Sequence, residues 1–178
     1  MATEAIKSAT ITSLDATPPV RTTTGAGSAG RLIYADGSAV FANSMTAGST
    51  YQMVRVPSNA IIKRIWACID TAVTTFTVDI GVYYSSGLDV TADLRGDVLD
   101  ADLFGSAVAL ASVVVPTQYT MEAAAAALTV ADMFLPLWNL AGLSNDPSCG
   151  LDIVMTNTAT NDTTSTAYLA VEYIIPGA

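Results

Sequence analysis

In the sequence from Thr74 to Tyr84, TTFTVDIGVYY, apolar side chains alternate with polar or small ones, and this pattern is the clearest indication of the fold. The apolar set is Phe76, Val78, Ile80, Val82 and Tyr84, and the intervening set is Thr75, Thr77, Asp79 and Gly81. Successive side chains of a β-strand point to opposite faces of its sheet, so this alternation predicts one buried face and one water-facing face. An antiparallel sheet permits that arrangement. The stretch therefore predicts a half-buried antiparallel strand.

The same alternation occurs near the C-terminus. STAYLAVEYII (165–175) would turn Ala167, Leu169, Val171, Tyr173 and Ile175 inward, and LDIVMTNT (151–158) would place Leu151, Ile153 and Met155 on one side. Further apolar runs are TYQMVRV (50–56) and AIIKRIWACID (60–70), on either side of the turn PSN (57–59), and AVALASVVV (107–115), which Pro116 ends. Each run is bounded by turn residues, and we interpret each as a strand.

Asp36 and Gly37 stand between two apolar runs, RLIYA (31–35) and SAVFAN (38–43). Asp-Gly favours the positive φ angles of a two-residue hairpin turn, so we expect a hairpin here with one strand on each side. The predicted total is then about eight strands, a number typical of a two-sheet jelly roll. We therefore predict an all-β fold, a jelly-roll-type β-sandwich of antiparallel strands.

Two short segments predict helix instead. TMEAAAAAL (120–128) begins with a candidate N-cap, Thr120, and continues with alanines, which have the highest helix propensity. PLWNLAG (136–142) begins at Pro136 and would end at Gly142. We expect one or two short helices that cover an open end of the sandwich.

Residues 1–30 predict an extended N-terminal arm, and residues 31–178 predict a single β-sandwich domain. The segment GAGSAG (25–30) has the glycine spacing of a dinucleotide-binding loop, which needs a buried strand before it and an acidic residue about 20 positions later. Pro18 and Pro19 exclude a central strand before the loop, and no acidic residue occurs between Ala42 and Ile69. We interpret the glycines as the pliant end of the arm, where the backbone can lie close against a neighbouring subunit.

Charged residues make up 13% of the chain, against about 25% in typical soluble domains. Charges are depleted at the cores of interfaces, so we favour an oligomer or larger assembly over the alternative, a monomer with a Thr-rich surface. The 16 acidic residues outnumber the 7 basic ones, which argues against direct binding of nucleic acid because Lys and Arg neutralise phosphates. No stretch is long and apolar enough to predict a membrane span.

The chain contains no histidine. The usual general base, the usual zinc ligand and the usual partner of a nucleophilic Ser or Cys are therefore missing. Since the carboxylates form no recognisable catalytic set either, we expect neither an enzyme nor a cofactor. Cys68 and Cys149 lie far apart in the sequence, and we expect free buried thiols, with a single disulfide as the alternative.

The segment LDVTADLRGDVLDADLF (88–104) is rich in aspartate. Four of its carboxylates are candidate Ca²⁺ ligands, namely Asp93, Asp97, Asp100 and Asp102. Their spacing is not that of an EF-hand, and we prefer a solvated loop between strands, without an adhesive role for the RGD tripeptide at 95–97. Trp66 and Trp138 could stack on a sugar, but their apolar surroundings favour packing in the core.

Four segments together resemble a known family. SATITSLDATPPVR (8–21), YQMVRVPSNAIIKRI (51–65), TTFTVDIGVYY (74–84) and LPLWNLAGLSNDPSCGLDIVMTNTAT (135–160) are similar, in this order, to the head decoration (cement) proteins of tailed bacteriophages. The turn PSNA and the segment PLW…GL…DP carry most of the resemblance. It implies a jelly-roll β-sandwich on the outer surface of the virion's capsid, made in the cytoplasm of the bacterial host.

The resemblance also implies partners. Copies would associate as dimers or trimers and bridge neighbouring major capsid subunits, which stabilises the head without cofactor, direct nucleic-acid contact or membrane. We expect the contacts with the capsid or with other copies in and beside the arm, at Arg21, Gly25, Gly27, Gly30 and Arg31. The alternative is a head-fibre or tail-associated module that binds a receptor or glycan, and such a module should expose aromatic side chains beside polar groups.

Overall fold

The computed structural model describes residues 32–43, 46–85, 97–119, 132–159 and 163–176. These ranges contain the strands β1 (Leu32–Phe41), β2 (Thr50–Pro57), β3 (Ile61–Ile69), β4 (Thr77–Tyr84), β5 (Val98–Ala109), β6 (Thr117–Tyr119), β7 (Gly150–Asn157) and β8 (Ser165–Ile174). They also contain a 3₁₀ turn, η1 (Asp132–Phe134), and a short helix, α2 (Leu137–Leu140). Neither helical segment is long and apolar enough to cross a membrane. The predicted all-β fold is confirmed.

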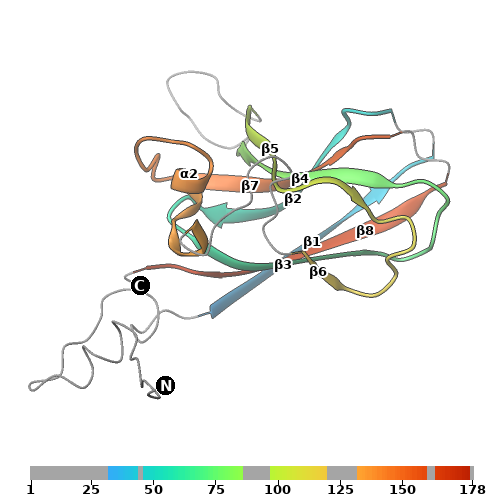
Figure 1. Ribbon diagram of the computed structural model, residues 1–178, viewed down its shortest axis with the longest axis horizontal. Coiled ribbons are helices and arrows are strands. Elements are labelled where there is room, and N and C mark those ends of the chain that lie inside the picture. The colour runs from blue at the N-terminus through green and yellow to red at the C-terminus, as the bar shows by residue number, and fades with distance from the viewer. Residues whose placement is uncertain (1–31, 44–45, 86–96, 120–131, 160–162, 177–178) are drawn as a thin grey trace, which may run out of the picture.

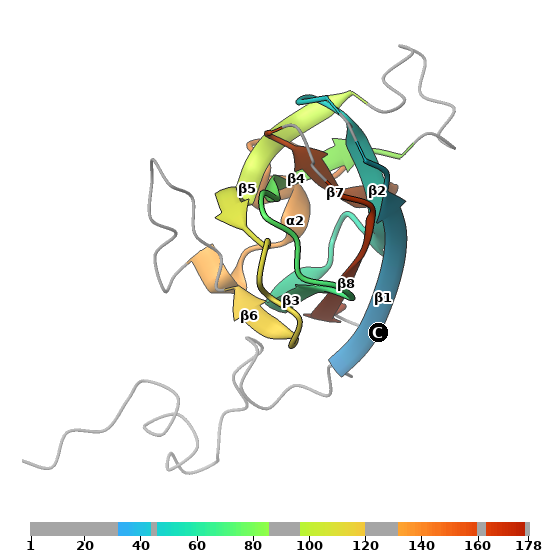
Figure 2. The ribbon, with the colours of Figure 1, turned by 90° about the vertical axis from the view of Figure 1, so that its right-hand side faces the viewer.

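The strands of these ranges form two facing four-stranded sheets (Figures 1 and 2). Sheet A has the order β1-β8-β3-β6 and sheet B the order β2-β7-β4-β5, and every pair of neighbours is antiparallel. The chain changes sheet at each connection except the one from β4 to β5. This strand order is that of a jelly roll, as the sequence predicts.

The core lies between the inner faces of the two sheets. All of the side chains predicted to point inward from segments 74–84 and 165–175, which contain β4 and β8, are buried except Tyr84 and Ile175, which are half-buried. At one end of the core Phe41 and Phe76 meet edge to face, with ring centroids 4.7 Å apart, an arrangement that aromatic pairs prefer. The alternation of apolar residues therefore predicts correctly which faces of these strands pack together.

The predicted hairpin at Asp36 and Gly37 is wrong. Both residues lie in the middle of β1, opposite Ala170 and Leu169 of β8. A Cβ atom on Gly37 would lie 1.9 Å from the carbonyl oxygen of Met53 in β2. The glycine is needed for a close approach of two backbones, where the edges of the two sheets meet, and not for a turn.

The acidic segment also differs from the prediction, because β5 begins at Val98 and passes through Asp100 and Asp102. The solvated loop predicted over this segment is therefore partly strand. Of the strand predicted at 107–115, only residues 107–109 belong to β5, at its end. The register between β4 and β5 shifts three times, and Ala107 has a φ of +47°. Such bulges interrupt the alternation from which a strand is recognised.

Helix α2 lies at one end of the sandwich, as expected (Figure 1). Pro136 is its N-cap residue, and Gly142 follows it with a φ of +78°. Leu137 is fully buried, and its N–H donates to the carbonyl oxygen of Ala60 over 2.8 Å. The other predicted helix, 120–128, lies outside the described residues.

Candidate functional site

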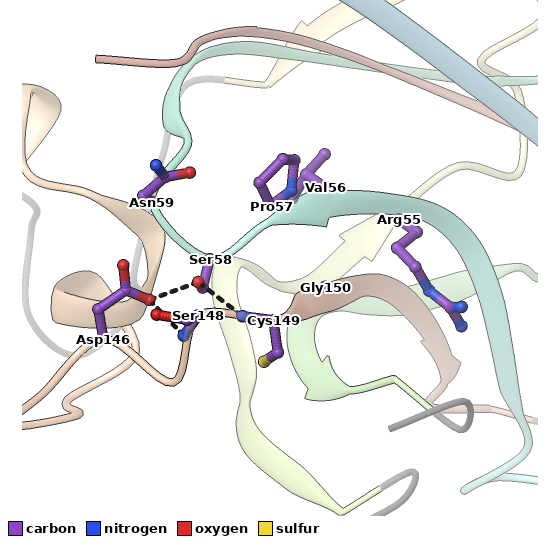
Figure 3. A pocket seen from close by; sticks show the side chains of 9 residues that line it. All are labelled: Arg55, Val56, Pro57, Ser58, Asn59, Asp146, Ser148, Cys149 and Gly150. Atoms are coloured by element: carbon purple, nitrogen blue, oxygen red, sulfur yellow. Dashed lines mark hydrogen bonds between the residues drawn. The ribbon is translucent and has the colours of Figure 1, made fainter. Parts of the chain in front are cut away.

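A cavity of about 640 Å³ opens at this end of the sandwich (Figure 3). It lies between the turn that joins β2 to β3 and the loop that precedes β7, and its lining residues are Arg55, Val56, Pro57, Ser58, Asn59, Asp146, Ser148, Cys149 and Gly150. Helix α2 is attached to the same turn, since the N–H of Trp138 donates to the carbonyl oxygen of Ser58 over 3.0 Å. The two segments that carry most of the family resemblance are thus in direct contact.

Hydrogen bonds join the two loops around Ser58, which is 2% exposed. Its hydroxyl donates to Oδ1 of Asp146 over 2.5 Å and accepts from the N–H of Cys149 over 3.2 Å. The same oxygen of Asp146 accepts from the N–H of Ser148 over 2.8 Å, a local pairing typical of aspartate in turns. The N–H of Ser58 donates to the carbonyl oxygen of Cys149 over 2.7 Å. Ser58 is therefore fully occupied as a link between the loops.

Arg55 forms one side of the cavity and pairs with Asp152 directly across the strands β2 and β7. Its Nε and one terminal nitrogen lie 2.6 Å and 3.0 Å from the two carboxylate oxygens. The side chain of Asp152 is 3% exposed and that of Arg55 is 51% exposed. The hydrogen bond to Asp152 raises the pKa of Arg55. Arg55 is therefore the counter-ion of a buried carboxylate, a structural role.

The groups in this cavity do not form a catalytic set. The thiolate is the reactive form of cysteine, but burial raises the pKa of the Cys149 thiol, and the charge of Asp146 raises it further. The hydroxyl of Ser58 faces a carboxylate and not an imidazole, and that carboxylate is already engaged by Ser148. Both cysteines are free, as predicted, although they are half-buried and not fully buried. The arrangement holds two loops together and offers a polar hollow without an activated nucleophile.

The predicted site residues are only partly described. Arg21, Gly25, Gly27, Gly30, Arg31 and Asp93 lie outside the described ranges. Asp97 is exposed just before β5, and the N–H of Asp102 donates to Oδ1 of Asp100 over 3.2 Å. Burial raises the pKa of Asp100. Within the part of the chain that the structure describes, no three His, Cys, Asp or Glu side chains gather as metal ligands would.

A second hollow, of about 390 Å³, lies on the outer face of sheet A, where no sequence motif predicts a site. Trp66 lines it, so the expectation that this tryptophan packs in the core is wrong. Its neighbours Ile65 and Ala67 point into the core, which turns Trp66 outward together with Arg64 and Cys68. The polar Arg64, two residues before Trp66, is the signal in the sequence that identifies this outer face.

No protein-family model and no curated protein matches the sequence. Among solved structures, a chain of the "Cyanophage Pam1 capsid asymmetric unit" is similar, with a TM-score of 0.51, 16% identity, and coverage of 91% of this chain and 97% of that chain. A chain of the "Capsid of Ralstonia phage GP4" is similar with a TM-score of 0.56, 14% identity, and coverage of 87% and 92%. At these identities the likeness is one of fold. The chain therefore shares its β-sandwich fold with chains of two phage capsid assemblies.

Proposed function

We propose that this chain is a structural protein of a phage virion, which binds the outer surface of the assembled head and bridges major capsid subunits. The observation that carries the proposal is the fold. A jelly roll that covers most of this chain is similar to chains from the Pam1 and GP4 capsids, and those chains are matched over nearly their full length. The unreactive cavity at the α2 end supports a structural role over an enzymatic one.

The proposed mechanism is thermodynamic. A protein that binds the assembled lattice, and not its free subunits, stabilises the lattice by the free energy of binding. Association of copies into dimers or trimers makes attachment multivalent, so that weak individual contacts give lasting occupancy. In this proposal the domain of residues 31–178 binds the lattice, and the arm of residues 1–30, which could extend up to about 100 Å, reaches a neighbouring subunit.

Quantitative mass spectrometry of purified virions of the encoding phage tests this function. We expect the chain at a copy number in the hundreds, comparable to the major capsid protein. Labelling of intact virions with a reagent that does not enter the head should modify the chain, because it is expected outside. A count of a dozen or fewer would contradict the proposal and favour a head-fibre or tail-associated module that binds a receptor or glycan. A chain protected from the reagent would contradict the outer location.

A further inference from the structure

The outer face of sheet A carries a group of aromatic and acidic side chains centred on Ala170. Ala170 of β8 lies opposite Asp36 of β1 on one side and opposite Trp66 of β3 on the other. Residues two positions away along each strand share its face. The residues that surround Ala170 on this face are Tyr34, Asp36, Ser38, Arg64, Trp66, Cys68, Tyr168 and Glu172. We call Tyr34, Asp36, Trp66, Tyr168 and Glu172, which all line one hollow, the aromatic–acidic cluster.

The cluster is concave because its centre is small. The methyl group of Ala170 stands among long side chains, and the hollow above it measures about 390 Å³, within the range of about 300–1,000 Å³ that is typical of ligand pockets. Tyr34 and Tyr168 are 61% and 44% exposed. Two large aromatic side chains are thus left in contact with water beside a hollow that could receive another group.

The acidic members of the cluster differ in their partners. Glu172 accepts a hydrogen bond from Arg64 over 3.3 Å. Asp36 is exposed, and within the described residues its carboxylate forms no hydrogen bond or ion pair, although its backbone pairs with β8. The remaining cations of the described ranges are engaged elsewhere: Arg55 with Asp152, and Lys63 with the carbonyl oxygen of Met133 over 3.0 Å. The described cations therefore leave the carboxylate of Asp36 open to a cation from outside this part of the chain.

The exposed apolar surface extends beyond the cluster. Leu32 and Val40 lie on the same outward row of β1 and are also exposed. The two outer faces of the sandwich differ, since Asp152 and Val154, which point outward from β7 in sheet B, are buried. A broad apolar face with a polar centre is typical of a surface that contacts a protein, whereas a free small molecule needs only the hollow.

We propose that the outer face of sheet A docks on a basic protein surface, which inserts one arginine or lysine side chain among Tyr34, Trp66 and Tyr168. Aromatic ring faces attract a cation, and Asp36 supplies the opposite charge. The same face of a second copy fits poorly, because it would bring Asp36 and Glu172 against their own counterparts. The inference rests on the proposed function in taking the partner to be a subunit of the head, but the chemistry of the cluster is testable without heads.

The first test uses the full chain with Trp138→Phe, so that Trp66 is the remaining one of two tryptophans. The probe is N-acetylarginine methylamide, and its control is the citrulline compound, which has a similar shape without the charge. We expect a saturable change in Trp66 fluorescence with the arginine probe and no such change with the citrulline compound. Asp36→Asn should abolish the change, whereas Asp97→Asn, which removes an exposed charge just before β5, should preserve it.

Three results would overturn this inference. They are an equal response to the citrulline compound, saturation by methyl glucoside in place of arginine, and the absence of any saturable response up to the solubility of the probe. Circular dichroism of each variant checks that the sandwich is intact. Since this readout contains no heads, a negative result here leaves the virion function standing.

The second test uses heads that lack this chain. Asp36→Lys should weaken binding to these heads at least tenfold, because it places a like charge opposite the inserted cation. Asp97→Lys changes the net charge equally and should leave the affinity within twofold. Equal weakening by both variants would contradict a docking face in sheet A. If the wild-type chain responds to arginine in the first test but binds no heads, the cluster is confirmed and the virion function is wrong.

Discussion

Asp152 is a buried carboxylate on the outer face of sheet B, and Arg55 is the described residue that balances its charge. Both of its oxygens are bonded to Arg55, whose side chain is half exposed. We predict that Arg55→Ala lowers the free energy of unfolding by about 2–3 kcal/mol, since it leaves a buried carboxylate with its hydrogen bonds unmade. The matched control is Arg64→Ala, whose pair with Glu172 is longer and more exposed, with an expected loss below about 1 kcal/mol.

Urea unfolding of the two variants measures the difference. The double substitution Arg55→Met with Asp152→Leu should recover most of the loss, because two apolar side chains need no counter-ion. Equal losses at Arg55 and Arg64 would show that burial of the carboxylate does not matter here. A double variant as unstable as Arg55→Ala would show that the attraction within the Arg55–Asp152 pair exceeds the free-energy cost of removing its charges from water.

At the scale of the strand, Gly37 sets the distance between the edges of the two sheets. Its missing Cβ would overlap the backbone of Met53, which lies where the register of β2 and β7 shifts. We predict that Gly37→Ala costs about 2–3 kcal/mol of stability, because a backbone atom cannot rotate out of the way as a side chain can. Ser38→Ala, on the exposed side of β1, should change stability by less than about 0.5 kcal/mol. Thermal unfolding compares them, and a neutral Gly37→Ala would mean that the two edges separate easily.

The strands differ in how far the sequence reveals them. β4 and β8 are regular and central, so one face is apolar throughout and the alternation gives both their existence and their inward residues. β1 and β5 are edge strands. Asp-Gly in β1 has the composition of a turn, and its real constraint is contact with a strand of the other sheet, which no local pattern encodes. The predicted total of about eight strands agrees with the eight that the structure describes, but for a compensating reason. The prediction divides β1 into two strands of a hairpin and omits β6.

The surface sites show the same limit. Segments 57–60 and 136–150 contain the motifs that carry most of the resemblance in the sequence. The structure brings these segments together at one end of the sandwich. The aromatic–acidic cluster, in contrast, draws on three strands far apart in the sequence. Tyr34 and Trp66 become neighbours of Ala170 only through the order β1-β8-β3. Sequence periodicity indicates the outward face of each strand, but it does not give the order of strands in a sheet.

For the whole molecule, the proposed division into an arm and a domain predicts that the two are separable. The core side chains of the described ranges run from Phe41 to Tyr173, so residues 1–30 precede every one of them. We predict that deletion of residues 1–30 leaves the sandwich folded, with a change in unfolding free energy below about 1 kcal/mol. The same deletion should weaken oligomerisation or attachment to heads, because it removes the contacts expected of the arm.

Thermal unfolding, light scattering and titration of heads lacking this chain measure these effects. The control replaces residues 1–30 with a Gly/Ser segment of equal length, which keeps the mass and removes the specific side chains. If the arm binds through its own residues, the replacement should behave like the deletion. If it acts only as a spacer, the replacement should behave like the wild type. A truncated chain that saturates heads with unchanged affinity would refute the arm's role and leave the outer face of sheet A as the principal contact with the head.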